Sequence, residues 1–350
     1  MKKRVLLGMS GGVDSSTSAV ILKEKGYEVV GATMRLWENG ETEEPDSIKD
    51  AKKVCDKLGI EHHVIDLRKE FKENVIDNFI CTYLCGKTPN PCVECNKYMK
   101  FDMFYKFAKK LNCDYIATGH YAKIEYSEKY NEYVLVKSNE EKKDQTYFLY
   151  GINKEILPHI IFPLSEFSNK DEIRNIAEKN CLEVAKKKES QEVCFIPDND
   201  YAGFLNRNCN KLNNKKGNII LNNGKILGKH SGIINYTVGQ RKGLGISYTE
   251  PLYVLRIDKD NNNVIVGTEK ELYSKTLKAN ELNFLLDIDL TKKIEVKAKI
   301  RYRAKEAFAT LNIKDNYALV EFKEPQRAIT PGQSVVFYLD NIVLGGGKII

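Results

Sequence analysis

Two features of the chain carry residues whose types and spacing are suited to chemistry. The first, residues 8–16, reads Gly-Met-Ser-Gly-Gly-Val-Asp-Ser-Ser and directly follows a short apolar run. Glycines let the backbone turn tightly and approach a ligand, while free amides and serine hydroxyls at a helix N-terminus bind anions. Neither the Gly-Lys-Ser/Thr of ordinary nucleoside triphosphatases nor the three glycines of a dinucleotide fingerprint is present. The segment therefore predicts a phosphate-binding loop of another type.

The second feature is a set of cysteines. Cys92 and Cys95 lie three positions apart on a loop stiffened by prolines, just before an expected helix. A helix N-terminus stabilises the thiolate, which is the reactive form of cysteine. Cys194 follows a polar stretch much later in the chain. A Cys-x-x-Cys pair by itself leaves a redox pair, half of a metal site and coincidence open.

The elements that must position these residues alternate between short apolar runs and helical patterns in the first half of the chain. This alternation predicts a doubly wound α/β domain with a parallel sheet between helices. The expected strands are Arg4–Gly8, Glu28–Met34, His62–Asp66 and Asp114–Thr118. The expected helices are Ser15–Lys25, Ser47–Leu58, Lys69–Phe79, Lys97–Leu111, with Asn96 as its N-cap, and Lys170–Lys179.

After about residue 203 the pattern changes to short alternating strands separated by Gly and Pro turns. The expected strands here are Tyr253–Ile257, Val264–Gly267, Ile294–Ile300, Tyr317–Phe322 and Ser334–Tyr338. We expect three domains, namely a catalytic α/β domain (1–203), a small, basic, loop-rich central β domain (204–268) and a C-terminal β-barrel (269–350).

Composition limits the class of protein. No run approaches the ~18 consecutive apolar residues of a membrane span, so an integral membrane protein is excluded, and 9 Cys in 350 residues favour a reducing cytoplasm over a disulfide scaffold. The net charge of +7 is uneven, because residues 1–203 hold 31 basic and 34 acidic side chains whereas residues 204–268 hold 10 and 3, and residues 269–350 hold 14 and 11. This asymmetry indicates a polyanionic partner.

The phosphate segment resembles the pyrophosphate loop (PP-loop) of the N-type ATP pyrophosphatases, which cleave ATP between the α and β phosphates to adenylate an oxygen. The resemblance implies ATP and Mg²⁺ as cofactors. Serines of the loop would hold the leaving pyrophosphate, and Asp14 would orient the loop or the Mg²⁺ ion. The residues implied to bind ATP are Gly8, Met9, Ser10, Gly11, Gly12, Val13, Asp14, Ser15, Ser16, Met34 and Gly119.

Over essentially its whole length the chain resembles the tRNA-specific 2-thiouridylases. The matching segments are 86–101, 117–121, 143–149, 194–196, 228–232, 236–245, 301–303 and 331–333. This family adenylates the C2 oxygen of the wobble uridine in the tRNA anticodon and replaces that oxygen with sulfur. The resemblance implies that Cys95 is the nucleophile and that Cys194 carries the sulfur as a persulfide.

The same resemblance implies the partners and their contacts. The partners would be tRNA and a sulfur source, which is a persulfide carrier, a cysteine desulfurase or sulfide. The target base would lie against Asn90, Pro91 and Cys92. Contacts with tRNA would come from His120, Lys143, Asp144, Gln145, Arg301, Tyr302 and Gln333.

Cys92 stands where much of the family has Asp, and this leaves the sulfur step open. Three thiols at Cys92, Cys95 and Cys194 suffice for a [4Fe-4S] cluster whose open iron binds sulfide, whereas the persulfide route makes Cys92 an accessory thiol. Two other functions are considered. A PP-loop ligase that joins an amine to an adenylated substrate needs no thiol, and a structural zinc module needs four ligands, of which the sequence offers no recognisable second pair.

Overall fold

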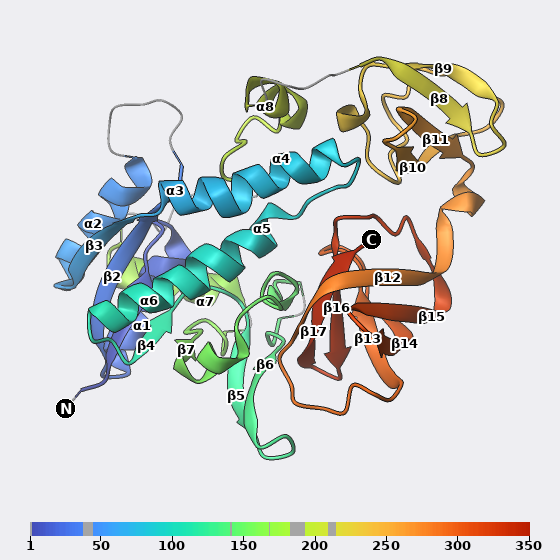
Figure 1. Ribbon diagram of the computed structural model, residues 1–350. Coiled ribbons are helices and arrows are strands. Elements are labelled where there is room, and N and C mark those ends of the chain that lie inside the picture. Colours follow the sequence, from blue (N-terminus) through green and yellow to red (C-terminus); the bar gives the residue numbers. More distant parts are fainter. Residues whose placement is uncertain (1, 38–44, 141, 168, 183–192, 209–214) are drawn as a thin grey trace.

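The structure is a computed structural model that describes residues 2–37, 45–140, 142–167, 169–182, 193–208 and 215–350 (Figure 1). Its first part contains a five-stranded parallel sheet with the order β3-β2-β1-β4-β7. The strands are β1 (Arg4–Gly8), β2 (Glu28–Arg35), β3 (Glu61–Asp66), β4 (Tyr115–Ala117) and β7 (Ile160–Ile161). The four strands predicted for this region are confirmed to within one residue at each end.

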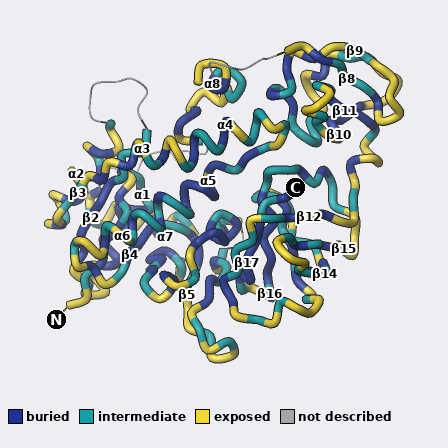
Figure 2. The backbone as a smooth tube through the Cα atoms, viewed as in Figure 1, coloured by how far each residue is buried: buried dark blue, intermediate teal, exposed yellow. Residues whose placement is uncertain are grey.

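Helices cover both faces of this sheet, because its central strands are apolar at consecutive positions. Val5 and Leu7 of β1 belong to one core, which includes residues of α1 (Val13–Glu24), α2 (Asp46–Leu58) and α7 (Lys170–Lys179). Leu6, between them, belongs to a second core on the opposite face. Figure 2 shows the central strands β1 and β2 as largely buried between these layers. The doubly wound α/β fold is therefore confirmed.

The second core is covered by two long helical rods that contain wide, π-helical turns. The first rod runs through α3 (Arg68–Phe71), η1 (Lys72–Ile76) and α4 (Asp77–Leu84), and the second through α5 (Pro91–Glu94), η2 (Cys95–Met103) and α6 (Phe104–Lys110). The prediction that Asn96 caps the second rod is wrong. Pro91 occupies the first helical position, which it favours because its φ is already helical, so Asn96 lies inside the rod and is buried.

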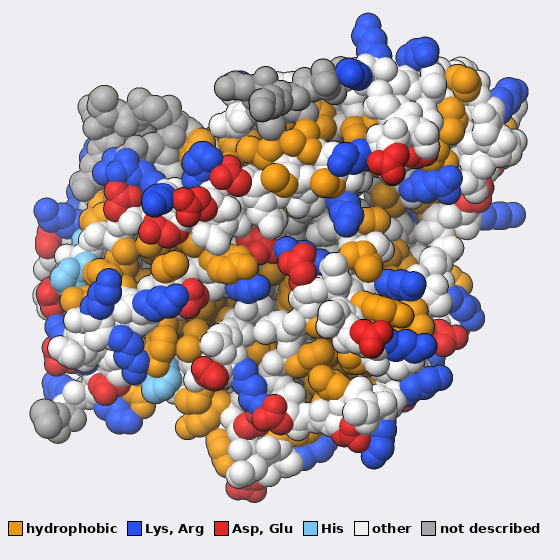
Figure 3. Space-filling model, viewed as in Figure 1, with side chains coloured by type: hydrophobic (Ala, Val, Ile, Leu, Met, Phe, Trp, Pro, Cys, Tyr) orange, Lys and Arg blue, Asp and Glu red, His pale blue; other side chains and the backbone are white. Residues whose placement is uncertain are grey.

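The central region is a small four-stranded sheet with the order β10-β11-β8-β9, joined to the first part by α8 (Tyr201–Asn208). Its strands are β8 (Gly217–Leu221), β9 (Ile226–His230), β10 (Tyr253–Asp258) and β11 (Asn263–Gly267). Its core is formed mainly by Ile219, Val254, Val264 and Val266. Lys and Arg side chains surround this region at the upper right of Figure 3.

The C-terminal region is a closed antiparallel barrel with the strand order β12-β15-β14-β13-β16-β17, in which β17 pairs again with β12. Its strands are β12 (Tyr273–Phe284), β13 (Ile294–Lys299), β14 (Ala307–Lys314), β15 (Tyr317–Arg327), β16 (Ser334–Leu339) and β17 (Ile342–Ile349). The predicted barrel is confirmed. A hairpin from the first part of the chain, β5 (Lys123–Ser127) and β6 (Glu132–Val136), extends the barrel sheet through the pair Val136 and Ile342.

Short 3-10 helices connect these parts, namely η3 (Thr146–Phe148), η4 (Lys154–His159), η6 (Ile233–Asn235) and η7 (Glu269–Leu272). The barrel lies beside α5 and the loop before it (Figure 1). Within the described ranges of the chain, no helix is long and apolar enough to cross a membrane.

Candidate active site

The phosphate loop lies at the carboxyl end of β1, where the strand order reverses between β1 and β4. Open α/β sheets bind ligands at this switch point. Gly11 has a φ of +67°, and a Cβ there would lie 2.6 Å from the Ser47 carbonyl oxygen, so a side chain is excluded. The Ser10 amide donates to Ser15 Oγ (3.2 Å), and Ser16 Oγ donates to the Gly12 carbonyl (2.8 Å). These local bonds hold the loop in its turn.

Other residues implied to bind ATP lie at the ends of neighbouring strands. Gly119 follows β4, and a Cβ at this position would lie 3.1 Å from the Asp14 carbonyl carbon, so the backbone of Gly119 packs directly on the loop. Met34 is the second-to-last residue of β2 and is half-buried. The predicted residues therefore gather at the carboxyl edge of β1, β2 and β4.

Two residues that the sequence analysis missed contact the carboxylate of the loop. Tyr121 donates its hydroxyl hydrogen to Asp14 Oδ1 at 3.0 Å, and Nζ of Lys170 lies 3.9 Å from the same oxygen. The Lys170 side chain is only 14% exposed, and burial lowers its pKa while the charge of Asp14 opposes this shift. Lys170 begins α7, far from the loop in sequence, so no local motif identifies it. The loop thus has a cation beside it.

The Lys-Asp-Gln segment before η3 supports this arrangement. Gln145 Oε1 accepts from the Tyr121 amide (2.9 Å), and the Gln145 amide donates to the Tyr121 carbonyl (3.0 Å). Nζ of Lys143 lies 5.3 Å from the centre of the Tyr121 ring. Asp144 is buried and accepts from the Ser138 amide at 3.1 Å. Gln145 and Asp144 therefore hold protein structure in place, and Lys143 is the member of this segment whose cation is partly exposed.

Cys92 and Cys95 lie on the second rod, and Cys194 lies on a turn that is far away in sequence. Cys95 is the first residue of η2 and is 8% exposed, whereas Cys92 and Cys194 are exposed residues. Cys194 belongs to a turn in which the Ile196 amide donates to the Val193 carbonyl at 2.9 Å. Residues 190–192, which precede this turn in the predicted polar stretch, lie outside the described residues.

Phe195 anchors the Cys194 turn to the core. It is 2% exposed, and its ring centre lies 5.6 Å from that of Phe71, 5.4 Å from that of Phe79 and 5.3 Å from that of Phe204. Aromatic pairs at such separations contribute beyond the area that they bury. The aromatic cluster therefore fixes the turn against the first rod and against α8.

Burial and neighbouring charges shift the pKa values of all three thiols. Burial raises the pKa of Cys95 to about 12, Lys100 lowers it, and Cys194 and Cys92 raise it. Burial also raises the pKa values of Cys92 and Cys194, although both residues are exposed on one side, and Lys100 lowers both. The backbone amides of Cys194 and Phe195 further lower the pKa of Cys194.

Lys100 is thus a cation near all three thiols, and the sequence analysis missed it. It lies five positions after Cys95 within the wide turns of η2. Because a π-helical turn brings residues i and i+5 together, the two side chains share one face of the rod. Only knowledge of the helix type could have identified this pairing from the sequence.

The three cysteines do not form a metal-binding group in this arrangement. Among the residues that the structure describes, no three or more Cys, His, Asp or Glu side chains lie close enough together to hold a metal ion. A three-thiol cluster site requires such a convergence. In this arrangement the described residues do not fit the cluster.

The barrel clamps the loop that precedes the Cys pair. Gln333 Nε2 donates to the carbonyls of Thr88 (3.2 Å) and Pro89 (3.0 Å), and the Thr88 amide donates to the Pro331 carbonyl (2.9 Å). The side chain of Asn90 hydrogen-bonds to the Tyr147 hydroxyl, which donates to the Ser334 carbonyl at 3.0 Å. The segment implied to meet the target base is therefore positioned by the barrel.

The remaining residues implied to contact tRNA come from both the α/β part and the barrel. His120 packs between the rings of Phe101 (5.8 Å) and Phe162 (6.1 Å), and burial lowers its pKa well below the usual range. Arg301 donates to the carbonyls of Arg327 and Ala328. The ring centre of Tyr302 lies 4.5 Å from that of Phe148, with the ring planes tilted by 40°, so Tyr302 reaches from the barrel to the α/β part.

Comparison with known proteins gives matches along the whole chain. Residues 3–198 match the model described as tRNA methyl transferase HUP domain, residues 203–268 that of a tRNA methyl transferase PRC-barrel domain, and residues 274–349 that of an aminomethyltransferase beta-barrel domain. The chain is 50% identical over 357 residues to the tRNA-specific 2-thiouridylase MnmA of Clostridium botulinum, covering 99% of this chain and 98% of that protein. It is 47% identical to the protein of the same name from Clostridioides difficile, covering 100% and 98%.

Among solved structures, the chain is similar to a 4-thiouridine synthetase in complex with RNA and ATP, with 17% identity and a TM-score of 0.39 over 56% of this chain and 45% of that one. It is also similar to the U34-tRNA thiolase NcsA of Methanococcus maripaludis, with 19% identity and a TM-score of 0.35 over 56% and 61%.

Proposed function

Because the chain belongs to the tRNA-specific 2-thiouridylase family, we propose that it uses ATP to replace the C2 oxygen of the wobble uridine in the tRNA anticodon with sulfur. It is an enzyme, a tRNA-uridine 2-sulfurtransferase. The observation that carries the proposal is the presence, in one α/β unit, of a pyrophosphate-type loop and of two cysteines from distant segments, Cys95 on η2 and Cys194 in the turn at 193–196. Neither feature alone implies sulfur transfer.

In the first step the uridine C2 oxygen attacks the α-phosphorus of ATP. The bond between the α and β phosphates breaks, pyrophosphate leaves, and the base carries AMP on that oxygen. Ser10, Ser15 and Ser16 hold the leaving pyrophosphate, and Lys170 lies beside the loop as a counter-charge. Asp14 is a carboxylate of the kind that binds Mg²⁺, which offsets phosphate charge when bound.

In the second step Cys194 carries the sulfur as a persulfide. The terminal sulfur attacks C2, and AMP leaves with the original oxygen. The Cys95 thiolate then attacks Sγ of Cys194, which releases the sulfur to the base and leaves a disulfide between the two cysteines. A thiol reductant must reduce this disulfide before the next turnover. Lys100 favours both thiolates because its positive charge lowers their pKa values.

The target base is proposed to lie against Asn90, Pro91 and Cys92, which the barrel clamps from the other side. The other proposed contacts with tRNA are His120, Lys143, Asp144, Gln145, Arg301, Tyr302 and Gln333. For Gln333, Asp144 and Gln145 the hydrogen bonds described above support a role in holding the pocket. A base buried in such a pocket must leave the anticodon stack.

We propose that residues 1–203 carry out the chemistry and that the basic side chains of residues 204–268 contact phosphates of the tRNA. Residues 269–350 would form the barrel side of the tRNA site. The 10 basic and 3 acidic side chains of residues 204–268 support a contact with phosphates. A cytoplasmic location belongs to the same proposal, and the free state of all described cysteines supports it.

A direct assay tests the function. Purified protein with ATP, unmodified tRNA and a persulfide donor should form thiolated uridine together with equal amounts of AMP and pyrophosphate. Formation of ADP in step with thiolation would contradict the assignment of the loop. Full activity of Cys95→Ser on an amine substrate would instead favour a ligase.

A further inference from the structure

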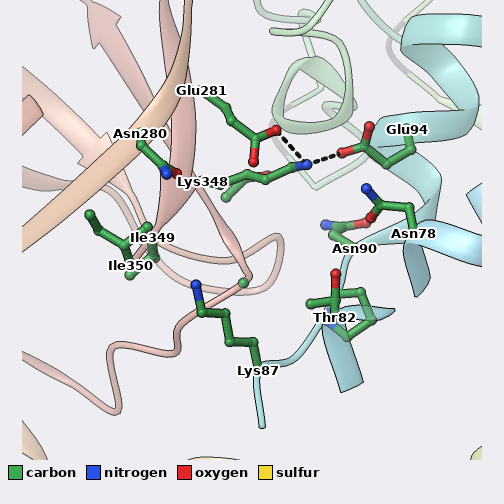
Figure 4. Close-up of a pocket in the computed structure, with 13 residues that line it drawn as sticks. Asn78, Thr82, Lys87, Asn90, Glu94, Asn280, Glu281, Lys348, Ile349 and Ile350 are labelled. Carbon is green, nitrogen blue, oxygen red and sulfur yellow. Dashed lines mark ion pairs between the residues drawn. The ribbon is translucent and has the colours of Figure 1, made fainter. Parts of the chain in front are cut away.

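A buried carboxylate immediately precedes the nucleophilic cysteine in the sequence. Glu94, the residue before Cys95, is 5% exposed. Its Oε1 lies 3.1 Å from Nζ of Lys348 on β17, and this nitrogen also lies 2.7 Å from Glu281 Oε2 on β12. Figure 4 shows the Lys348 ammonium between the two carboxylates. A buried carboxylate is costly without a partner, so Lys348 supplies the counter-charge of Glu94.

Lys348 is itself held by a rigid part of the barrel. It pairs with Ser334 across β16 and β17, and Ser334 Oγ lies 3.1 Å from the Tyr150 hydroxyl. A Cβ on Gly346 would lie 2.7 Å from the Tyr150 ring, so the strand and this ring are in close contact. Burial opposes the charge of Lys348, but its hydrogen bonds with Glu281 and Glu94 outweigh this, and its pKa is raised.

The side of α5 that faces the barrel borders a cavity. A cavity of about 120 Å³ lies between α4 and the barrel, and its lining includes Asn78, Thr82 and Lys87 in addition to Glu94 and Lys348 (Figure 4). Side chains that border an open space lose the contacts that would otherwise fix them. The ion pair beside this cavity links α5 directly to β17, in addition to the hydrogen bonds that hold the loop before α5.

We propose that Lys348 is a positioning residue for the reaction, which acts through Glu94 to fix α5 and hence the Cys95 thiol at the distance from Cys194 that sulfur release requires. The inference rests on the proposed function, in which these two sulfurs must form a bond. Lys348 touches neither of the two sulfurs. Through its ion pair with Glu94, it holds the Cys95 thiol in a fixed position relative to the barrel.

The test compares Lys348→Met with Lys348→Arg and with the double variant Glu94→Gln/Lys348→Met. Single-turnover thiolation and the KM for ATP are measured, together with the rate of Cys95–Cys194 disulfide formation under diamide without tRNA. Lys323→Met is the matched control, since Lys323 pairs with Glu295 at 3.5 Å and both side chains are more than 60% exposed.

Lys348→Met should slow both thiolation and disulfide formation about tenfold or more, because small misplacements of reacting atoms cost up to about a hundredfold in rate. The KM for ATP should not change. Lys348→Arg should restore both rates. The double variant should recover the Tm, because no unpaired carboxylate remains buried, but neither rate.

Two results would overturn the inference. One is a Lys348→Met protein whose disulfide forms as fast as in Lys323→Met. The other is a double variant that recovers both the Tm and the rates, which would make the pair merely structural. If wild type formed no thiolated uridine while Lys348→Met still slowed the disulfide, the proposed function would fail and the positional role would stand.

Discussion

The phosphate loop and the thiol site differ in how the chain builds them. The loop occupies nine consecutive residues, and the hydrogen bonds made within it join residues three to five positions apart. The thiol site combines η2, the turn at 193–196 and the barrel turn at 331–333. A site built from one segment depends on local backbone geometry, whereas a site built from three depends on the packing that brings them together.

This difference has a functional consequence. Changes in the packing around the thiols should slow sulfur transfer and leave ATP chemistry intact, whereas changes in the loop should stop both, since adenylation comes first.

The largest effect is expected at the loop. Asp14→Ala should reduce tRNA-dependent AMP formation by about a hundredfold or more, because removing one preorganised electrostatic group commonly costs that much in rate. Binding of tRNA, measured by filter retention, should change little. Asp102→Ala, which breaks an exposed pair with Lys106, is the control. Unchanged AMP formation in Asp14→Ala would remove the loop from the mechanism.

At the thiol site, the largest effect on stability is expected for Phe195→Ala. Truncation of a buried Phe costs roughly 3–5 kcal/mol, and the Cys194 turn would lose its anchor. Denaturant unfolding should show this loss, and thiolation should slow while ATP binding persists. Phe308→Ala is the control, because Phe308 is 58% exposed. Normal thiolation by a folded Phe195→Ala protein would contradict the expectation that sulfur transfer depends on the packing around the thiols.

A smaller effect is expected for Lys170→Met. Loss of a charged partner for the phosphates should raise the KM for ATP about tenfold, since hydrogen bonds to charged groups contribute roughly 1.5–3 kcal/mol. The rate of Cys95–Cys194 disulfide formation should stay constant. Lys179→Met, at the other end of α7, should behave as wild type. An effect on the disulfide would show that the two sites are not separable.

The pH dependence of the thiols gives a further test. With the pKa of Cys95 at about 12, its alkylation by iodoacetamide should keep accelerating above pH 9, and Lys100→Met should slow it several-fold at any pH below 12. The folded pKa lies above the usual value of 9.0, so the stability that this thiol contributes is complete below pH 9 and is lost as the pH rises toward 12. Lys106→Met is the control, and equal alkylation rates in the two variants would contradict the role of Lys100.

The smallest effect is expected for Cys92→Asp. Because the three thiols do not converge on a metal site among the described residues, and because much of the family has Asp at this position beside the target base, this variant should retain thiolation within about twofold. Protein purified without oxygen should contain no stoichiometric iron. Iron in wild type, together with loss of activity in Cys92→Asp, would instead establish the cluster route.

The sequence predicts most of the fold and the part of the site that one segment forms, which is the phosphate loop. The strands from Arg4 to Ala117 and the barrel strands β13, β15 and β16 follow from apolar periodicity, whereas β12, β14 and β17 are not predicted. The phosphate loop follows from its own residues. The sequence does not predict that the hairpin β5–β6 joins the barrel, that Asn96 lies inside a rod, or that Lys170 reaches Asp14. These features depend on contacts between distant segments, for which periodicity and capping patterns carry no information.

The most direct test of the account is a single-turnover experiment with labelled ATP and Cys194→Ser. We expect this variant to release pyrophosphate at the wild-type rate and to accumulate tRNA that carries AMP, with no thiolated uridine. That result would separate the loop from the thiols within one protein. Loss of pyrophosphate release in Cys194→Ser, or thiolated uridine in its tRNA, would contradict the account.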